Sequence, residues 1–299
     1  MQISENWGEL LLPILRGIFN RQIGKHKDYI PVLFNREDSK KAQEFNLGTG
    51  NLGLMVPWEE SGRQTSYEDR YKGFKATYTH RKYSKGIELE RELLDDDQYS
   101  EIKKGVKELS DIAHYTRQYH AVGVFNDAFS AANEGPDGKP LCATDHPLSP
   151  TNSKEWSNAG SLSLTADNVE KTRIEMMKWT DDKGKLLIVN PDTLLVPPSL
   201  RKAALVIADT EGEPDTTDNN VNIWHGNVDV VEWQLLTDSN AWFFIDMQRA
   251  KRFLRWFDRR KPDFSNHVHW DTEAARYRVI GRWSYGWDDP SFIYGHDPS

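Results

Sequence analysis

The stretch that decides the fold runs from Leu93 to Asn133 and reads LLDDDQYSEIKKGVKELSDIAHYTRQYHAVGVFNDAFSAAN. Apolar or large side chains recur along it every three or four residues, which is the repeat of one helix face. They are Ile102, Val106, Leu109, Ile112 or Ala113, Thr116, Tyr119, Phe125 and Phe129. The acidic run 95–97 suits the start of a helix, and the turn residues 135–138 end the pattern. At 1.5 Å per residue the pattern predicts a helix roughly 45 Å long, which Gly105 and Gly123 could bend or interrupt.

A strictly alternating pattern precedes this helix between Tyr71 and Leu89. One side of it carries Phe74, Ala76, Tyr78 and His80, and the other carries Lys75, Thr77, Thr79 and Arg81. This period of two is typical of a β-ribbon, and the turn-rich stretch 48–53 leads into it. Because an isolated two-stranded ribbon is only marginally stable in water, we expect a ribbon that stands away from the body to rest on a neighbouring copy of the chain.

The first thirty residues form an amphipathic segment. Trp7, Leu11, Ile14, Leu15 and Ile18 recur at helical spacing. Pro13 and Gly17 interrupt the pattern, so short helical pieces are expected. The segment has two equally weighted interpretations, a helix docked on its own core or an arm laid on a neighbour.

The second half of the chain mixes short helices and strands. Thr165 can cap a helix over 166–180, with Leu164 and Val169 as a hydrophobic staple. A short helix is expected from Pro197 to Asp209. Strands are predicted at 186–189 (buried), 194–196, 228–233, 241–245 and within 253–287, where arginines alternate with apolar residues. This order of elements predicts an α+β fold.

Composition excludes several classes of protein. The 299 residues include 11 Trp, 11 Tyr and 12 Phe, so the chain is not a disordered one. The net charge of −8 argues against a dedicated nucleic-acid binder, although a basic run spans 249–261. A single cysteine indicates a reducing compartment, and the apolar stretch 10–15 is too short for a signal peptide or membrane span.

No catalytic motif outweighs its structural interpretation. Cys142 with Asp145 and His146 is a possible nucleophile group, but sequence neighbours rarely have the geometry of catalytic partners. His267, His269 and Asp271 would share one strand face, and two histidines on a strand can seed a metal site, yet neither a third ligand nor a rigid second shell is visible. Tryptophans spread over every element favour burial over a sugar-binding platform. We therefore predict no enzyme activity, no cofactor and no metal.

Several short motifs occur in a fixed order and resemble one family. They are LCATDHPL (141–148), NAG (158–160), LT (164–165), DTLLVPP (192–198), NIW (222–224), AWF (241–243), FDRRKP (257–262) and RWSYGW (282–287). Together they are similar to the Mu-type major head subunit family, a branch of the tailed-phage major capsid proteins with the Hong Kong 97-type fold.

The resemblance implies a division of labour along the chain. It implies an N-terminal arm leading into the peripheral domain (1–44), an extended loop (45–92), a peripheral domain with a long spine helix (93–160), an axial domain (161–242) and a return to the peripheral sheet (243–299). Leu11, Ile14, Trp58 and Tyr78 are the candidate contacts between subunits.

The resemblance also implies partners and a location. The chain is expected to assemble with itself, as hexamers and pentamers, into an icosahedral shell around double-stranded DNA, which it contacts without sequence specificity. A separate scaffolding protein is expected because no long charged helical segment opens the sequence, and a maturation protease and portal are expected with it. Assembly in the bacterial cytoplasm, a place in the virion and no membrane partner follow. The alternatives are a cysteine hydrolase using Cys142 and His146, and a Trp-rich carbohydrate-binding surface module.

Overall fold

The long helix is present as α4, Tyr99–Asn126, in the computed structural model, which describes residues 7–55, 67–89, 99–212, 222–268 and 275–298. Its 28 residues make it about 42 Å long, and neither Gly105 nor Gly123 interrupts it. The helix face predicted to pack on the core is confirmed at Ile102, Val106, Leu109 and Phe125, which are buried. The prediction is wrong at Tyr119, whose side chain is 55% exposed.

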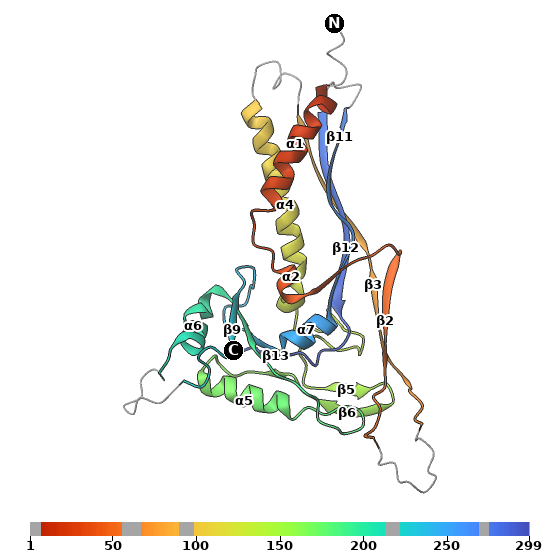
Figure 1. Ribbon diagram of the computed structural model, residues 1–299, viewed down its shortest axis with the longest axis vertical. Coiled ribbons are helices and arrows are strands. Elements are labelled where there is room, and N and C mark those ends of the chain that lie inside the picture. The colour runs from red at the N-terminus through yellow and green to blue at the C-terminus, as the bar shows by residue number, and fades with distance from the viewer. Residues whose placement is uncertain (1–6, 56–66, 90–98, 213–221, 269–274, 299) are drawn as a thin grey trace. The chain divides into compact units, whose positions relative to one another are not determined.

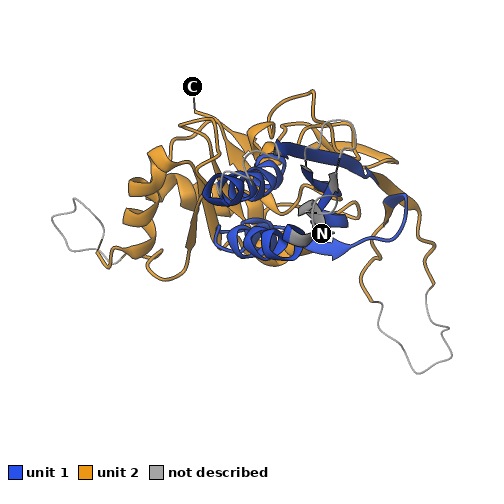
Figure 2. Ribbon diagram, turned by 90° about the horizontal axis from the view of Figure 1, so that it is seen from above, with its two compact units in different colours: residues 1–44, 78–121, 256–285 blue, residues 45–77, 122–255, 286–299 orange. Residues whose placement is uncertain are grey.

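The chain divides into two compact units, coloured separately in Figure 2. Unit 1 comprises residues 1–44, 78–121 and 256–285. Unit 2 comprises residues 45–77, 122–255 and 286–299. Each unit is therefore made of three separate stretches of chain, and several long elements begin in one unit and end in the other.

Unit 1 is a sheet with helices on one face (Figure 1). The strand order is β1 (Asn35–Asp38), β11 (Leu254–Val268), β12 (Ala275–Trp287) and β4 (Arg81–Leu89). Helices α1 (Trp7–Ile23) and α4 pack together on this sheet, and the short helix α2 (Ile30–Leu33) follows α1. Their shared core contains Leu15, Phe19, Ile102, Val106, Leu109, Phe264, Tyr277 and Val279.

Of the two interpretations of the first segment, a helix docked on its own core and an arm laid on a neighbour, α1 favours the first for the described residues. It docks on the core of its own unit, where Leu15 and Phe19 are 2% and 1% exposed. The expectation of short helical pieces was wrong, because α1 runs without a break through Pro13 and Gly17. Burial of its apolar face stabilises the helix by more than the lost proline hydrogen bond costs.

The predicted ribbon is split between two sheets. Strand β3 (Lys72–Thr79) pairs with β2 (Gln43–Thr49), whereas β4 pairs with β12. The alternation is confirmed, since Ala76, Tyr78 and His80 are buried. The second half of the ribbon does not stand away from the body, because it is a strand of the unit 1 sheet.

Between β3 and β4 the side chain of His80 is fixed on both sides. Its Nε2 lies 3.1 Å from Ser39 Oγ and its Nδ1 lies 2.9 Å from Ser284 Oγ. Burial lowers the pKa of His80 below its usual value. A neutral imidazole, with one donor and one acceptor nitrogen, fits two hydroxyl partners.

Unit 2 is built on a five-stranded sheet. Its strand order is β7 (Ala159–Gly160), β13 (Ile293–His296), β10 (Trp242–Ile245), β8 (Thr193–Val196) and β9 (Asp229–Glu232). Unit 2 also contains most of the β2–β3 pair, the hairpin β5 (His146–Ser149) and β6 (Asn152–Trp156), the helices α5 (Ala166–Met177), α6 (Arg201–Asp209) and α7 (Met247–Phe253), and the 3-10 turn η1 (Pro198–Leu200). All four residues of β8 and of β10 are buried, as expected for central strands.

In unit 2 the predicted helix cap and the predicted hydrophobic pair beside it are present, whereas one predicted strand is not. Thr165 caps α5 by accepting a hydrogen bond from Asn168 N, as predicted. Leu164 and Val169 are both buried in the same core cluster. The buried strand predicted at 186–189 was wrong, because Leu186 and Ile188 are 62% and 93% exposed and only an isolated bridge joins Thr180 to Leu186.

None of the helices in the described ranges is both long enough and apolar enough to cross a membrane.

Candidate assembly surface

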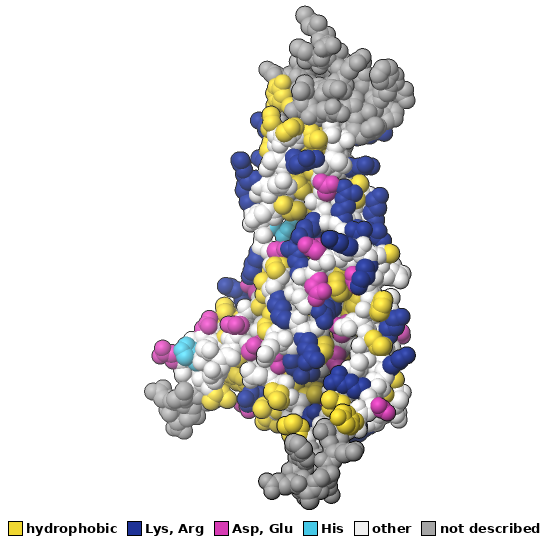
Figure 3. All heavy atoms as spheres, turned by 45° about the vertical axis from the view of Figure 1, so that its right-hand side comes forward, with side chains coloured by type: hydrophobic (Ala, Val, Ile, Leu, Met, Phe, Trp, Pro, Cys, Tyr) yellow, Lys and Arg dark blue, Asp and Glu magenta, His cyan; other side chains and the backbone are white. Residues whose placement is uncertain are grey.

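Large apolar side chains are exposed along β2 and on both sides of the segment 56–66. Leu54, Met55 and Tyr67 are 78%, 99% and 89% exposed. Phe45, Leu47 and Leu52 are exposed as well. Figure 3 shows hydrophobic side chains standing among Lys and Arg side chains on the face it presents. Soluble monomers rarely expose apolar groups in such numbers on one segment, so these residues are suited to a protein partner.

The base of this segment is firmly held within unit 2. Asp182 accepts a hydrogen bond from Asn51 Nδ2 at 2.7 Å and another from the Tyr71 hydroxyl. Burial alone would raise the pKa of Asp182, but the hydrogen bonds from Tyr71 and Asn51 lower it below its usual value. Gly50 N also donates to Tyr71 O at 2.9 Å, which closes the base of the loop.

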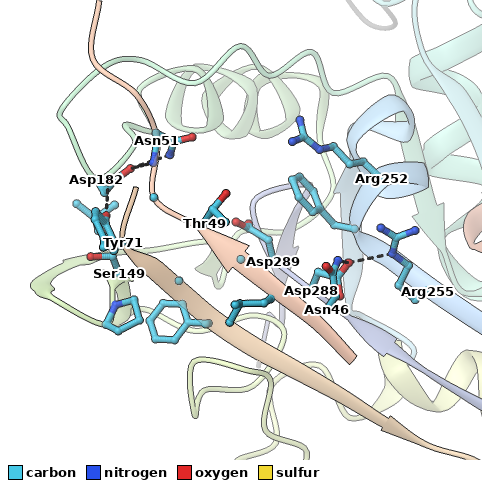
Figure 4. Close-up of a pocket in the computed structure, with 18 residues that line it drawn as sticks. Asn46, Thr49, Asn51, Tyr71, Ser149, Asp182, Arg252, Arg255, Asp288 and Asp289 are labelled. Atoms are coloured by element: carbon cyan, nitrogen blue, oxygen red, sulfur yellow. Dashed lines mark hydrogen bonds and ion pairs between the residues drawn. The ribbon is translucent and has the colours of Figure 1, made fainter. Parts of the chain in front are cut away.

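A cavity of about 300 Å³ lies beside this base. Figure 4 shows Asn51 and Tyr71 directed toward Asp182 on one side, and Asn46 and Arg255 meeting Asp288 on the other. Asn46 Nδ2 and Arg255 Nε lie 2.7 and 2.9 Å from Asp288 Oδ2. These two groups of polar side chains, centred on Asp182 and Asp288, fix the loop base while the apolar residues Leu54, Met55 and Tyr67 stay exposed.

The predicted contact residues differ in how exposed their side chains are. Ile14 is 59% exposed, whereas Leu11 packs partly buried against the core of unit 1. Tyr78 is only 5% exposed, and its ring lies 5.1 Å from that of Phe257. Its ring is therefore largely covered within its own chain, and a contact of Tyr78 with a second subunit stays a prediction. Trp58 lies outside the described residues.

Leu186 and Ile188 form an exposed apolar pair that the sequence reasoning missed. Both belong to the run 186–189, whose other members Leu187 and Val189 face the core of unit 2. A run of four apolar residues was interpreted as buried on both sides. The same run fits a segment with one face on the core and one face open to a partner, and periodicity alone does not separate the two.

The hydrolase alternative is contradicted by the surroundings of Cys142 and His146. Cys142 is 2% exposed, and burial raises the pKa of its thiol above its usual value, so the reactive thiolate is suppressed. His146 Nδ1 lies 2.6 Å from Asp137 Oδ2 and its Nε2 lies 3.0 Å from Asn158 Oδ1. Both ring nitrogens are thus occupied by structural partners, and neither serves as a base for the cysteine.

The part of the chain that the structure describes offers no site for the sugar-platform or the metal alternative. The tryptophans that would form a platform are buried to 6% exposure or less at Trp179, Trp224, Trp233, Trp242, Trp256, Trp283 and Trp287. Within the described ranges, no group of three or more His, Cys, Asp or Glu side chains could hold a metal ion. His269 and Asp271 lie outside those ranges, and the side chain of His267 is outside the described part too.

Comparison with protein families decides the identity. A model of the phage capsid protein family matches residues 75–295. The chain belongs to this family. The capsid protein also shares its fold with solved phage capsids, among them that of bacteriophage JBD30 decorated with minor capsid protein trimers. There the TM-score is 0.57 at 15% identity, over 71% of this chain and 92% of that chain.

Other solved structures agree with this fold. For Mycobacterium phage Adephagia the TM-score is 0.56 at 12% identity, over 92% of this chain and 91% of that chain. For a virus-like particle from Pyrococcus furiosus it is 0.51 at 11% identity, over 95% and 98%. A search of the curated proteins gave no match. The predicted α+β capsid fold of the Hong Kong 97 type and the predicted membership of the tailed-phage major capsid proteins are confirmed, and the capsid protein is a structural shell subunit rather than an enzyme.

Proposed function

We propose that this capsid protein builds an icosahedral shell of hexamers and pentamers around the double-stranded DNA of a tailed phage. The family match supports a shell subunit. The net charge of −8 supports a subunit that contains DNA without gripping it through its whole surface. Identical chains that bury apolar surface at repeated contacts convert weak individual contacts into a stable closed particle.

The proposed division of labour follows the chain. Residues 45–92 serve as the extended loop, 93–160 as the peripheral domain with α4 as its spine, and 161–242 as the axial domain. Residues 1–44 serve as the N-terminal arm and entry to the peripheral domain, with α1 docked on the core of its own unit, and 243–299 return to the peripheral sheet. The length of α4 supports its role as the spine, and the pairing of β11 and β12 in unit 1 supports the return of the chain to the peripheral sheet. Residues 122–160 and 286–299 belong to unit 2 together with 161–242, so the boundaries of the division remain part of the proposal.

The observation that carries the proposal is the exposure of Leu54, Met55 and Tyr67 beside a firmly held loop base. Removing such side chains from water is favourable by about 25 cal/mol per Å² of apolar surface buried. A neighbouring subunit that covers them provides this stabilisation. Ile14, Leu186 and Ile188 are further candidate contacts because they are exposed too.

The test removes the loop without touching the sheets. Residues 51–70 are replaced by a short Gly-Ser linker, since Gly50 and Tyr71 are already hydrogen-bonded. A longer deletion, to residue 85, would remove β3 and half of β4 and unfold the subunit. We expect a folded subunit, eluting as a small species in size-exclusion chromatography, that forms no particles under negative stain.

A substitution variant separates loss of contact from loss of the loop. L54S/M55S/Y67S removes the exposed apolar groups, and K154S/K171S/K202S is the matched control at exposed positions in unit 2. The triple apolar variant should lose particles and the control should keep them. Particles of normal appearance under negative stain from the 51–70 deletion would contradict the proposal.

Additional partners are proposed on the resemblance alone. These are a separate scaffolding protein, a maturation protease and a portal, with assembly in the host cytoplasm and packaged DNA on the inner face. Minor capsid protein trimers decorate the JBD30 capsid, and the same kind of decoration is a candidate here. Co-purification of particles from infected cells, followed by mass spectrometry, tests each of these partners.

A further inference from the structure

A cavity of about 410 Å³ lies between α4 and the sheet of unit 1. Four elements line it, with Leu109, Ile112, Ala113 and Thr116 from α4, Val279, Gly281 and Trp283 from β12, residues 82–85 from β4, and Pro262 from β11. All of these residues belong to unit 1, so the cavity is formed within one folded body. Its inner wall is buried, since Leu109, Val279 and Trp283 are 2%, 5% and 3% exposed.

The cavity exists because small residues face each other across the helix and the sheet. Gly281 pairs with Tyr83 in the register of β12 and β4, and it contributes no side chain. The ring of Trp283 covers Gly281 so closely that a Cβ there would collide with it. Ala113 is the smallest side chain that α4 contributes to the wall. Helix and sheet therefore leave a space that the close packing of an ordinary interior would fill.

The surface left for an occupant is mainly aliphatic. The aromatic rings of Tyr83 and Trp283 stack on each other, with centroids 4.4 Å apart. The hydroxyl of Thr116 donates to the carbonyl oxygen of Ile112 at 2.7 Å. Because these groups already have partners, an occupant meets mostly leucine, isoleucine, alanine, valine and proline side chains, which suit a hydrocarbon chain.

Positive charge stands on the β4 side of the cavity. Tyr83 faces α4, since its ring lies 4.4 Å from that of His120, and Lys85 shares that face because side chains alternate along a strand. Lys82 lines the cavity as well, and both lysines are exposed. Glu88, further along β4, pairs with an arginine of β12, and within the described residues no carboxylate forms an ion pair with either lysine.

We propose that this cavity binds a single-chain amphiphile with an anionic head, of the fatty-acid kind. Its hydrocarbon chain lies between α4 and the sheet, and its carboxylate lies at Lys82 and Lys85. A cavity of about 150 Å³ holds benzene in another protein, so 410 Å³ has room for a chain of about ten carbons. The two lysines select the charge of the head, because a cationic amphiphile of the same length is repelled.

Binding to the unassembled subunit tests the role of charge. Equilibrium dialysis with radiolabelled decanoate, 1-decanol and decylammonium compares three heads on one chain length. Decanoate should bind at least tenfold more tightly than decylammonium. K82S/K85S should weaken decanoate at least tenfold and leave 1-decanol unchanged, whereas K154S/K171S, at exposed lysines of unit 2, should leave both unchanged.

Filling the cavity tests the place of the hydrocarbon chain. Ala113→Phe should abolish binding of decanoate and of 1-decanol, because the added ring occupies the space beneath α4. Glu108→Phe adds the same ring at an exposed position of α4 that does not line the cavity, and it should leave binding unchanged. Urea unfolding shows whether each variant is folded. If Ala113→Phe does not fold, the comparison of K82S/K85S with K154S/K171S decides.

Thermal unfolding gives a further readout, since a ligand that binds only the folded chain raises the melting temperature. Decanoate should raise it in the wild type and in L54S/M55S/Y67S, which keeps the cavity and lacks the exposed apolar groups of the loop. Binding that survives Ala113→Phe but is lost in L54S/M55S/Y67S would place the amphiphile on the loop and overturn the proposal. Equal binding of decanoate and decylammonium, or no saturable binding of decanoate, would overturn it too.

Discussion

The guanidinium of Arg117 in α4 donates two hydrogen bonds to the carboxylate of Asp258 in β11, at 2.9 and 3.1 Å. The Asp258 side chain is fully buried, and it also accepts from Arg36 Nε at 2.7 Å and Trp256 Nε1 at 3.0 Å. Arg117 lies over the rings of Trp256 and Trp283. Burial opposes ionisation of Asp258, but the charge of Arg117 holds the pKa of this carboxyl below its usual value. The spine helix is thus joined to the sheet of unit 1 through one buried ion pair.

Asp258→Asn should lower the free energy of unfolding by about 3–5 kcal/mol, because it leaves the buried Arg117 without a compensating charge. Urea unfolding of the unassembled subunit measures this. Asp263→Asn is the control, since its ion pair with Arg260 is half exposed and should contribute about 1 kcal/mol or less. Equal losses in the free energy of unfolding from the two substitutions would show that the buried ion pair stabilises the subunit no more than the exposed one.

Stability should fall in mild acid because of His296. Leu162 N–H donates to His296 Nδ1, and Nε2 lies 2.8 Å from Thr172 Oγ1, so the folded state requires the neutral ring. Burial lowers the pKa of His296 to about 4, below the unfolded value of 6.5. The stabilising contribution is complete above pH 6.5 and is lost as the pH falls toward 4, by about 3 kcal/mol in all.

Melting temperatures between pH 7 and pH 4 check this expectation. His296→Gln should flatten the decline in that range, whereas His225→Gln, at an exposed position, should leave it unchanged. The same pH dependence in His296→Gln and wild type would assign the decline to other groups.

Gly17→Ala should stabilise the subunit. Gly17 lies inside α1, and a Cβ there would meet no atom within 4 Å. Alanine loses less backbone freedom on folding than glycine, so the free energy of unfolding should rise by about 0.5–1 kcal/mol. Gly73→Ala is the contrasting change, because its Cβ would lie 2.8 Å from the Gly48 backbone and should destabilise the β2–β3 pair. Chemical denaturation of both variants decides the sign of each effect.

Cys142 should be inert in the folded chain. With 2% exposure and a pKa raised by burial, its thiol should react with an aromatic disulfide reagent only as fast as the subunit unfolds. The exposed thiol of Ser84→Cys should react at once and serves as the positive control. Rapid labelling of Cys142 in the native subunit would contradict its structural role.

Local patterns in the sequence were sufficient to locate the elements that bury side chains at a regular spacing. The apolar repeat located α4, the Thr165 cap located α5, and the alternation of Phe74 through His80 located β3. These elements are predictable because each local preference agrees with the fold.

The errors have tertiary causes. Arg117 occupies a core position on α4 because Asp258, 141 residues away, neutralises it, and no hydrophobic pattern contains that information. Pro13 was expected to break α1, but packing on the sheet retains the helix. The exposed face of Leu186 and Ile188 is apolar, and sequence alone does not distinguish a face that meets a partner from one that meets the core.

The run of chain from Lys72 to Leu89 has a mechanical consequence. Its first part pairs with β2 next to the exposed loop, and its second part pairs with β12 over nine residues, with only His80 between them. Tension applied to the loop passes along this backbone into β4 without a slack linker. Pulled along its own axis, β4 is loaded in shear, so its ladder of hydrogen bonds to β12 resists together instead of opening one bond at a time. A force on the loop is therefore resisted by many backbone hydrogen bonds of unit 1 at the same time.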